Sequence, residues 1–525
     1  MKKSVLALGA AVVAGGLGFA GAAHAVAYLG AGNNPDGLPL ASDFRLNPGH
    51  TGHMLYMPYY TAQGANSTLL NITNTDTKRG KVVKVRFRGA ANSDDVLDFT
   101  VLLSPGDVWT ASVTKGADGF AFLSSDDSSC TLPVTVGRGA PFKGTRLPAY
   151  VSDAVKQTHT REGYMEVLNM ADVPAGSDLY KNIKHFKGVP GDCTGTAVQN
   201  LLTETVLAGP ADAAAAGLVA PSGQLTGWWA ILNQEQLAVY SGIMTAVQAV
   251  DGAGANGVGN VMMAPQTSEQ VTGDALTNTW KYTSDPLLRA GSPLYPPLWF
   301  DLPDMSTPLV PGLQPHEQAE KMATQVGHMS VTNDYLNDPA AGVSLLTDWV
   351  VSQPTRRYFA AVHYGDKMSD GKIYWNEDMT VPASSTVTTT APDLAKNRYG
   401  ALRYTDVSGY PFACLRFGMW YADREESFYS MTAETSPGEQ VRYCGEVFTM
   451  SFAGTSVLNS MLANVPLTPK VGATSAVSKA GWAKLNVTGT GAQPLPLVGF
   501  AATSAKNRGT NVNFGMTLPY RWAEN

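Results

Sequence analysis

The feature that most constrains the fold of this chain is a series of short segments between residues 67 and 113 in which apolar and polar side chains alternate. Because successive side chains of a strand point to opposite sides, this alternation predicts half-buried strands. The turn sequence Ser104-Pro-Gly-Asp107 separates two of them, since Pro fixes φ and Gly accepts a positive φ. Short strands at this spacing predict a mainly β chain built from antiparallel, immunoglobulin-like β-sandwich domains, and not a βαβ unit.

The alternation also assigns individual side chains to the two faces of these strands. We expect Phe87 and Phe99 to lie in the sandwich core, and Lys84, Arg86 and Asp98 to face solvent. A shift of register by one residue would bury the charged side chains in place of apolar ones, at a cost of several kcal/mol. This assignment predicts a large loss of stability for Phe99→Ala and almost none for Asp98→Ala.

The N-terminus has the features of a secretory signal peptide. Lys2 and Lys3 precede a run of apolar and small residues, and Ala23-His-Ala25 matches the A-x-A cleavage pattern. We therefore expect residues 1–25 to be removed and the exported chain to begin at Val26. No second apolar run reaches the roughly 18 residues of a transmembrane helix, so we expect no transmembrane segment in the mature chain.

Charge and composition narrow the class of protein. The chain has 37 Lys and Arg against 43 Asp and Glu, and only 15% of its residues are charged, compared with about 25% in a typical protein. It shows no basic patch of the kind that nucleic acid requires, which excludes nucleic-acid binding. The 53 Gly and 32 Pro suit a β protein that is rich in turns.

The chain contains four cysteines: Cys130, Cys193, Cys414 and Cys444. An even number in an exported chain predicts two disulfides, for which three pairings are possible. Proximity in sequence favours Cys130–Cys193 and Cys414–Cys444. Neither pair has the C-x-x-C spacing of a redox or zinc site, so we expect structural bridges.

A short pattern recurs along the chain. Gly163-Tyr-Met-Glu-Val-Leu-Asn169 aligns with Gly227-Trp-Trp-Ala-Ile-Leu-Asn233, and Gly481-Trp-Ala-Lys-Leu-Asn486 is the same pattern shortened by one residue. Each copy predicts a strand that ends in a turn, and the recurrence favours reuse of one β-unit over coincidence. The irregular spacing between copies excludes a solenoid.

We divide the chain into a signal peptide and three further parts. Residues 26–175 are expected to form an N-terminal β-sandwich, residues 176–340 a mixed, loop-rich middle region with a few short helices, and residues 341–525 a C-terminal β-rich domain. The clearest helix is predicted from Pro315 to Val326, because Pro suits the first helical turn and apolar residues recur at helical spacing.

We find no catalytic set in the sequence, and we expect neither an enzyme nor a cofactor or metal site. A serine hydrolase would need G-x-S-x-G, which does not occur. His50 and His53 lie three residues apart but lack an evident third ligand, so a solvated loop is favoured. The stretch 252–257 matches G-x-G-x-x-G in letters only, without a clear preceding strand and following helix.

Aromatic and acidic residues offer one alternative to a purely structural protein. Asp423, Glu425 and Glu426 lie beside Trp420 and Tyr421 in the sequence, and a second aromatic group consists of Trp228, Trp229 and Trp299. Aromatic rings stack on sugars, and a glycosidase needs two carboxylates about 5–9.5 Å apart. Acidic turns beside strand aromatics are common, however, and large aromatic side chains mostly lie in the core.

The segment Thr347-Asp-Trp-Val-Val-Ser-Gln-Pro-Thr-Arg-Arg357, together with the signal peptide, the Asn71-Ile-Thr-Asn74 strand and the Gly-Trp strands, resembles proteins of Gram-negative bacteria that are described only as cell-surface proteins. The resemblance spans most of the mature chain. It implies export and a β-rich envelope protein of surface-layer type, and it carries no functional residues to transfer.

Two functions follow from these observations. The first is an exported structural protein, located outside the cell, on its surface or in the periplasm, that self-associates or binds cell-envelope components as a surface layer or extracellular sheath. The alternative is a secreted carbohydrate-binding or carbohydrate-active protein. Export, low charge and richness in Ser, Thr and Gly favour the first.

Overall fold

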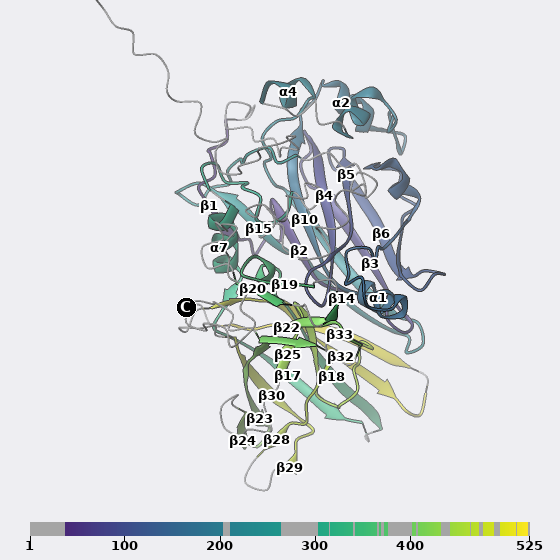
Figure 1. Cartoon of the computed structure of the whole chain (residues 1–525), viewed down its shortest axis with the longest axis vertical. Coiled ribbons are helices and arrows are strands. Elements are labelled where there is room, and N and C mark those ends of the chain that lie inside the picture. The colour runs from purple at the N-terminus through teal and green to yellow at the C-terminus, as the bar shows by residue number, and fades with distance from the viewer. Residues whose placement is uncertain are drawn as a thin grey trace, which may run out of the picture.

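The computed structural model places the strands of the chain in two stacked parts (Figure 1). The predicted signal peptide, residues 1–25, lies outside the described residues. The structure describes residues 37–202, 210–263, 303–313, 315–339, 342–364, 367–368, 372–375, 402–405, 408–431, 442–462, 464–471, 476–487, 494–510 and 512–522.

The first part is a sandwich of two antiparallel sheets. Its seven-stranded sheet has the order β1 (Asp43–Leu46), β15 (Thr245–Val250), β2 (Met54–Thr61), β10 (Glu162–Val173), β4 (Gly80–Gly89), β5 (Asp95–Leu103) and β8 (Cys130–Leu132). Its six-stranded sheet has the order β14 (Ala238–Ile243), β13 (Leu225–Asn233), β3 (Asn66–Asn74), β6 (Val108–Lys115), β7 (Ala121–Ser124) and β9 (Ala140–Pro141). Phe99 and Trp109 meet between the two sheets, with ring centroids 5.5 Å apart.

Both sheets of this sandwich take strands from beyond residue 175. Strand β13 pairs with β3, and β15 pairs with β2 and β1. The structural unit therefore includes residues 225–250, which lie outside the expected N-terminal range of 26–175. The segment from Leu237 to Val250, which is rich in small and β-branched residues, supplies two strands and no helix.

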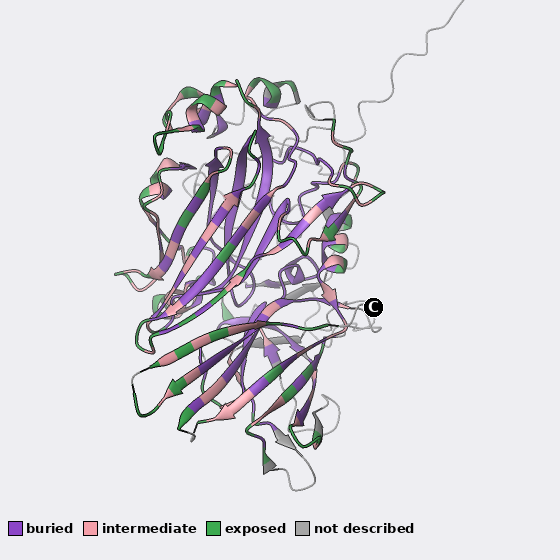
Figure 2. Ribbon diagram, turned by 180° about the vertical axis from the view of Figure 1, so that it is seen from behind, coloured by how far each residue is buried: buried purple, intermediate pink, exposed green. Residues whose placement is uncertain are grey.

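The two sheets differ in how far they are buried. Strands β2, β4, β5 and β10 of the seven-stranded sheet are buried along their whole length, whereas β3 and β6 alternate between buried and more exposed residues (Figure 2). The second face of the seven-stranded sheet meets later parts of the chain, as shown by the hydrogen bond from the Arg86 guanidinium to the carbonyl of Pro303. The seven-stranded sheet is thus an inner layer.

The helices are short. Among the described residues, the α-helices are α1 (Asp153–Thr160), α2 (Asp178–Ile183), α3 (Thr196–Gln199), α4 (Pro210–Ala215) and α7 (Pro315–Gln325), and the 3₁₀ helices are η2 (Val134–Arg138), η3 (Asn200–Leu202) and η7 (Arg356–Tyr358). The predicted helix from Pro315 is confirmed. Its apolar stripe is buried at Ala319, Met322, Ala323 and Val326. Helices α1 and α2 each begin after a serine whose hydroxyl accepts a hydrogen bond from a first-turn amide.

The second part is built around a nine-stranded sheet. Its strands are β24 (Phe428–Met431), β23 (Gly418–Asp423), β30 (Ala480–Asn486), β17 (Ser330–Asp338), β18 (Val343–Ser352), β26 (Val447–Ser451), β27 (Asn464–Pro466), β32 (Val498–Asn507) and β33 (Asn513–Pro519). Tyr335 of β17 and Trp349 of β18 both pack on Phe452, with ring centroids 5.1 and 5.4 Å apart. The two halves of the sheet therefore enclose a core.

Smaller sheets complete the fold. They are formed by β11 (His185–Phe186) with β12 (Val189–Pro190), β16 (Gly327–His328) with β31 (Leu495–Pro496), β19 (Ala360–His363) with β20 (Lys372–Trp375), β21 (Leu402–Thr405) and β25 (Arg442–Cys444) on either side of β22 (Pro411–Arg416), and β28 (Lys470–Val471) with β29 (Ala476–Val477). The predicted mainly β class, with antiparallel sheets and a few short helices, is confirmed.

The two disulfides pair as sequence proximity favours. Cys130 of β8 is bonded to Cys193, and Cys414 of β22 is bonded to Cys444 of β25. The first bridge ties the seven-stranded sheet to the segment before α3. The second joins two directly opposed residues of neighbouring strands. Both bridges therefore hold structural elements together.

The recurring glycine-aromatic pattern lies on three strands, β10, β13 and β30. A Cβ atom on Gly163 would lie 1.8 Å from the carbonyl oxygen of Arg88, and one on Gly481 would lie 1.9 Å from that of Ala422. Only glycine allows the neighbouring backbone to approach this closely. The same local requirement accounts for glycine at these two copies, and descent from one β-unit stays a prediction.

Candidate functional site

The charged side chains of β4 and β5 are buried, so the prediction that Lys84, Arg86 and Asp98 face solvent is wrong. Their exposed fractions are 2%, 0% and 8%. Phe87 and Phe99 are buried in the core, as predicted. The alternation therefore separated the two faces correctly, but both faces are covered because the sheet is an inner layer.

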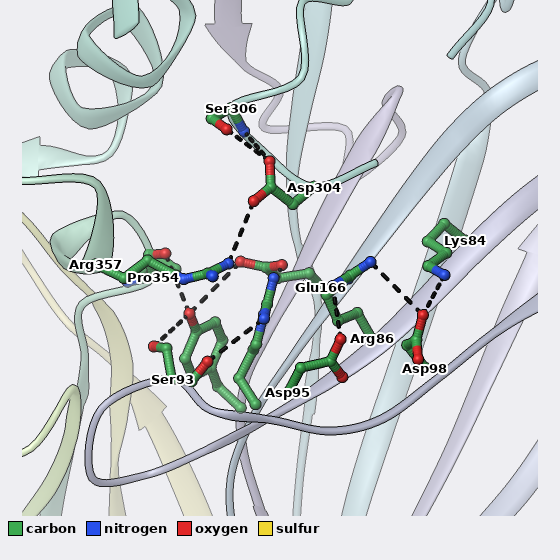
Figure 3. Close-up of polar contacts among 12 residues, drawn as sticks. Lys84, Arg86, Ser93, Asp95, Asp98, Glu166, Asp304, Ser306, Pro354 and Arg357 are labelled. Atoms are coloured by element: carbon green, nitrogen blue, oxygen red, sulfur yellow. Dashed lines mark hydrogen bonds and ion pairs between the residues drawn. The ribbon is translucent and has the colours of Figure 1, made fainter. Parts of the chain in front are cut away.

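The buried charges form a network across three neighbouring strands (Figure 3). The register places Arg86 of β4 opposite Asp98 of β5 on one side and Glu166 of β10 on the other. A nitrogen of the Arg86 guanidinium lies 2.6 Å from a carboxylate oxygen of Asp95, and Arg88 Nε lies 3.2 Å from Glu166 Oε2. Acidic side chains of β10 and β5 therefore flank the basic side chains of β4, which lies between them.

The network continues into the second half of the chain. The Arg357 guanidinium lies 3.3 Å from Asp304 Oδ2, and the Ser306 hydroxyl donates a 2.6 Å hydrogen bond to the same carboxylate (Figure 3). Ser93, which follows β4, donates a hydrogen bond to Glu446, whose carboxylate also lies 3.7 Å from Arg356 Nε. These contacts fasten the seven-stranded sheet to the 3₁₀ helix η7 and the segment around residue 304.

Burial governs the electrostatics of this network. It lowers the pKa of Lys84 to about 8 and raises the pKa of Glu166, against the opposing effect of Arg88. Burial alone would also raise the pKa of Asp98, but Lys84 and Arg86 hold that pKa below its usual value. Because these groups contact one another and are closed off from solvent, we assign the network a structural role.

The two histidines of the predicted loop differ in environment. His50 is exposed, as expected for a solvated loop, but His53 is fully buried and its Nδ1 accepts a 3.1 Å hydrogen bond from the amide of Ala249. The prediction of a solvated loop is therefore wrong for His53, which belongs to the sheet packing. In the part of the chain that the structure describes, no cluster of three His, Cys, Asp or Glu could hold a metal ion.

His159, at the end of α1, makes stability dependent on pH. Its ring stacks on Tyr410 with centroids 3.6 Å apart, and burial lowers the pKa of His159 from 6.5 to about 3. Below pH 6.5 the His159 ring is therefore protonated in the unfolded chain but stays neutral in the folded chain. The free energy of unfolding is therefore highest above pH 6.5 and decreases as the pH falls from 6.5 toward 3. At about pH 4.5 we expect a loss of about 2–3 kcal/mol from this group.

This prediction is tested by comparing denaturant melts of the wild type and His159→Phe at about pH 7.5 and about pH 4.5. The stability gap between the two proteins should shift by about 2–3 kcal/mol in favour of the variant at the lower pH. Asp348, whose pKa burial raises to about 6, affects both proteins equally. The exposed His50, replaced by Asn, serves as the control. If the difference in free energy of unfolding between the wild type and His159→Phe is the same at both pH values, His159 is not buried in its neutral form.

The acidic turn near Trp420 lies beside an aromatic cleft. Asp423 Oδ1 accepts hydrogen bonds from the amides of Glu425 and Ser427, at 2.9 and 2.8 Å, which closes the turn between β23 and β24. Asp423 and Glu426 also line a cleft of about 770 Å³. The ring of Trp420 lies 4.5 Å, centroid to centroid, from that of Trp482. The sequence pointed to Trp420 and the acids but not to this pairing with Trp482, which requires the register of β23 and β30.

The outer face of the six-stranded sheet is the second candidate site. At alternate positions of its four longest strands the outward-facing residues carry no charge, and Trp228, Val239 and Ile243 are 44%, 49% and 54% exposed. Lys115, the last residue of β6, is also exposed but lies out of this alternation. Of the other tryptophans in the predicted group, Trp229 is 2% exposed and Trp299 lies outside the described residues. The other residues of this face are Ser67, Leu69, Asn71, Thr73, Val108, Thr110, Ser112, Thr114, Thr226, Ala230, Leu232 and Ser241. We call these fifteen residues the uncharged face.

No protein-family model, curated protein or solved structure matches this chain. Among the described residues, no helix has the length and apolar character that crossing a membrane would require. The fold defines the chain as a mainly β protein that consists of two stacked sheet assemblies and contains two disulfides.

Proposed function

We propose that this chain is an exported structural protein of the cell surface, and not an enzyme, and that copies of it associate through the uncharged face to form a surface layer or sheath. The single observation that carries the proposal is the absence of charge from the outward residues of β3, β6, β13 and β14. Disulfides support export, because they persist in oxidising compartments outside the cytoplasm.

The chemistry of the uncharged face favours contact with another protein surface. Burying it removes apolar area from water at Trp228, Val239 and Ile243, and it desolvates no ionised group. The Ser and Thr hydroxyls of β3 and β6 can donate and accept hydrogen bonds across such a contact. A contact of this face with the same face of a second copy would give a two-fold dimer, which can serve as the repeating unit of a larger layer.

Other strands of the same sandwich do carry charged side chains. The buried strand β4 carries three basic side chains, Lys84, Arg86 and Arg88, although burying them requires carboxylate partners. The uncharged face, by contrast, carries none on strands that are half open to solvent. Solvation alone would favour charged side chains there, so their absence supports a role in contact.

Self-association is tested with Trp228→Glu in sedimentation velocity and electron microscopy of the purified chain. A buried carboxylate at this contact lacks a partner, so we expect association to weaken at least about tenfold. The matched control is Val477→Glu, because Val477 is 52% exposed and lies on β29, in the part of the molecule built around the nine-stranded sheet (Figure 1). Association that is equally strong in both variants and the wild type would contradict the proposal.

A second candidate function, carbohydrate binding, is favoured by the cleft beside Trp420 and Trp482. This cleft lies on the nine-stranded sheet and shares no residue with the uncharged face. The two functions can therefore be tested independently, and both are compatible with a protein of the cell exterior.

A further inference from the structure

Three aromatic side chains gather on one face of the nine-stranded sheet. Trp482 of β30 lies opposite Ala422 of β23 and Asp334 of β17, so a small residue leaves the face of its indole ring open on one side. Phe428 of β24 lies opposite Ala422 on the other side of β23 from Trp482. The rings of Trp420 and Phe428 are nearly parallel, with an interplanar angle of 23° and centroids 6.0 Å apart. The three rings form a continuous strip.

This aromatic strip is open to solvent. Phe428 is 65% exposed and Trp482 is 41% exposed, while Trp420, whose ring contacts both, is partly buried. Neighbouring Tyr421, which alternates with Trp420, is 1% exposed and packs in the core. The strand therefore buries one aromatic residue for stability and presents the next to the cleft, where exposure of large apolar rings favours a ligand.

Polar groups of both signs surround the strip. Asp334, Asp423, Glu426 and Arg424 line the same cleft, and Arg521 lies 2.8 Å from a carboxylate oxygen of Asp334. The three carboxylates outnumber the two arginines by one, so the cleft repels an anionic chain and offers a cationic chain only a weak net attraction. The lining instead suits a neutral ligand with many hydroxyls, which carboxylates can accept from and a guanidinium can donate to.

Building on the carbohydrate-binding function proposed above, we propose that this cleft binds a neutral glycan chain. Successive pyranose rings stack on Phe428, Trp420 and Trp482, because the apolar face of a sugar ring with equatorial hydroxyls matches an aromatic ring. Hydroxyls at the edges of the sugar bond to Asp423, Glu426 and Arg424 at the rim. The site would hold polysaccharide at the cell exterior without cleaving it.

The proposal is tested by native gel electrophoresis of the full chain in gels that contain hydroxyethylcellulose, with alginate as an anionic comparison. We expect the neutral polymer to retard the wild type and alginate to have no effect. Trp482→Ala should weaken retardation at least about tenfold, and Trp482→Phe should retain part of it because a ring remains. Thermal melts of both variants establish that they fold.

Phe186→Ala is the matched control, since it removes a 74% exposed aromatic ring of β11 that belongs to neither the cleft nor the uncharged face. It should leave retardation unchanged, and Trp482→Ala should leave self-association unchanged, so failure of either proposal is distinguishable from failure of the other. The glycan site is overturned if hydroxyethylcellulose does not retard the wild type, if alginate alone does, or if Trp482→Ala and Phe186→Ala behave alike.

Discussion

Replacing Arg88 by Met should lower the free energy of unfolding by about 3–5 kcal/mol, because the buried carboxylate of Glu166 then loses its ion-pair partner. The Arg88 guanidinium and the Glu166 carboxylate are both fully buried, and their nearest atoms are 3.2 Å apart. Urea melts of the disulfide-intact chain at neutral pH measure the loss. Arg424→Met, at an exposed arginine, should change stability by less than about 0.5 kcal/mol.

A double-mutant cycle separates the pair from the packing of its side chains. Arg88→Met combined with Glu166→Leu removes both charges, so the double variant should lose less stability than the two single variants added together. Simple additivity would mean that the two groups do not interact. A single-variant loss as small as that of Arg424→Met would mean that water reaches the network.

Replacing Phe99 by Ala should cost about 3–5 kcal/mol through lost transfer energy and the cavity left against Trp109. The structure changes the expectation for its neighbour. Asp98 forms a buried ion pair with Lys84, so Asp98→Ala should also cost about 3–5 kcal/mol, where the sequence alone predicted almost no effect. Denaturant melts of the full chain test the two variants together.

A second substitution at Lys84 should change the stability loss of Asp98→Ala but not that of Phe99→Ala. Lys84→Met should restore part of the stability lost in Asp98→Ala, because it removes the unpaired ammonium, and it should restore none of the loss in Phe99→Ala. If Asp98→Ala proves neutral, the charged face of β4 and β5 is open to water and the inner-layer arrangement is wrong.

Local patterns were sufficient to predict several features. Alternation identified strands β3, β4, β5 and β6, apolar spacing and Pro315 identified helix α7, and sequence proximity favoured the observed disulfide pairs. Each of these features depends on residues close in the sequence or on period-two and helical spacing. The mainly β class followed from them.

The errors arose where the answer depends on distant residues. The side chains of Lys84 and Arg86 alternate as those of a half-exposed strand do, and burial became possible only because Asp95, Asp98 and later segments supply partners. Matching acids on neighbouring strands are a signal for such burial, but the signal is readable only when the strand register is known. His53 was misplaced for the same reason, since its partner is the amide of Ala249.

The candidate sites were predictable to different degrees. Trp420 and the acids near it stood out in the sequence, whereas Phe428 and Trp482 join them only through the pairing of β24, β23 and β30. The uncharged face required knowing which residues of β13 and β14 point outward. Composition hinted at it through the 15% charged fraction, without locating it.

Electron cryotomography of the cell surface, with and without the gene for this chain, tests the central claim most directly. The account predicts an ordered layer or sheath outside the cell that disappears with the gene and returns when the wild-type chain is supplied. It predicts that Trp228→Glu is exported but fails to restore order, while Val477→Glu restores it. An unchanged surface in cells that lack the chain would contradict the assignment of this protein as a structural component of the cell exterior.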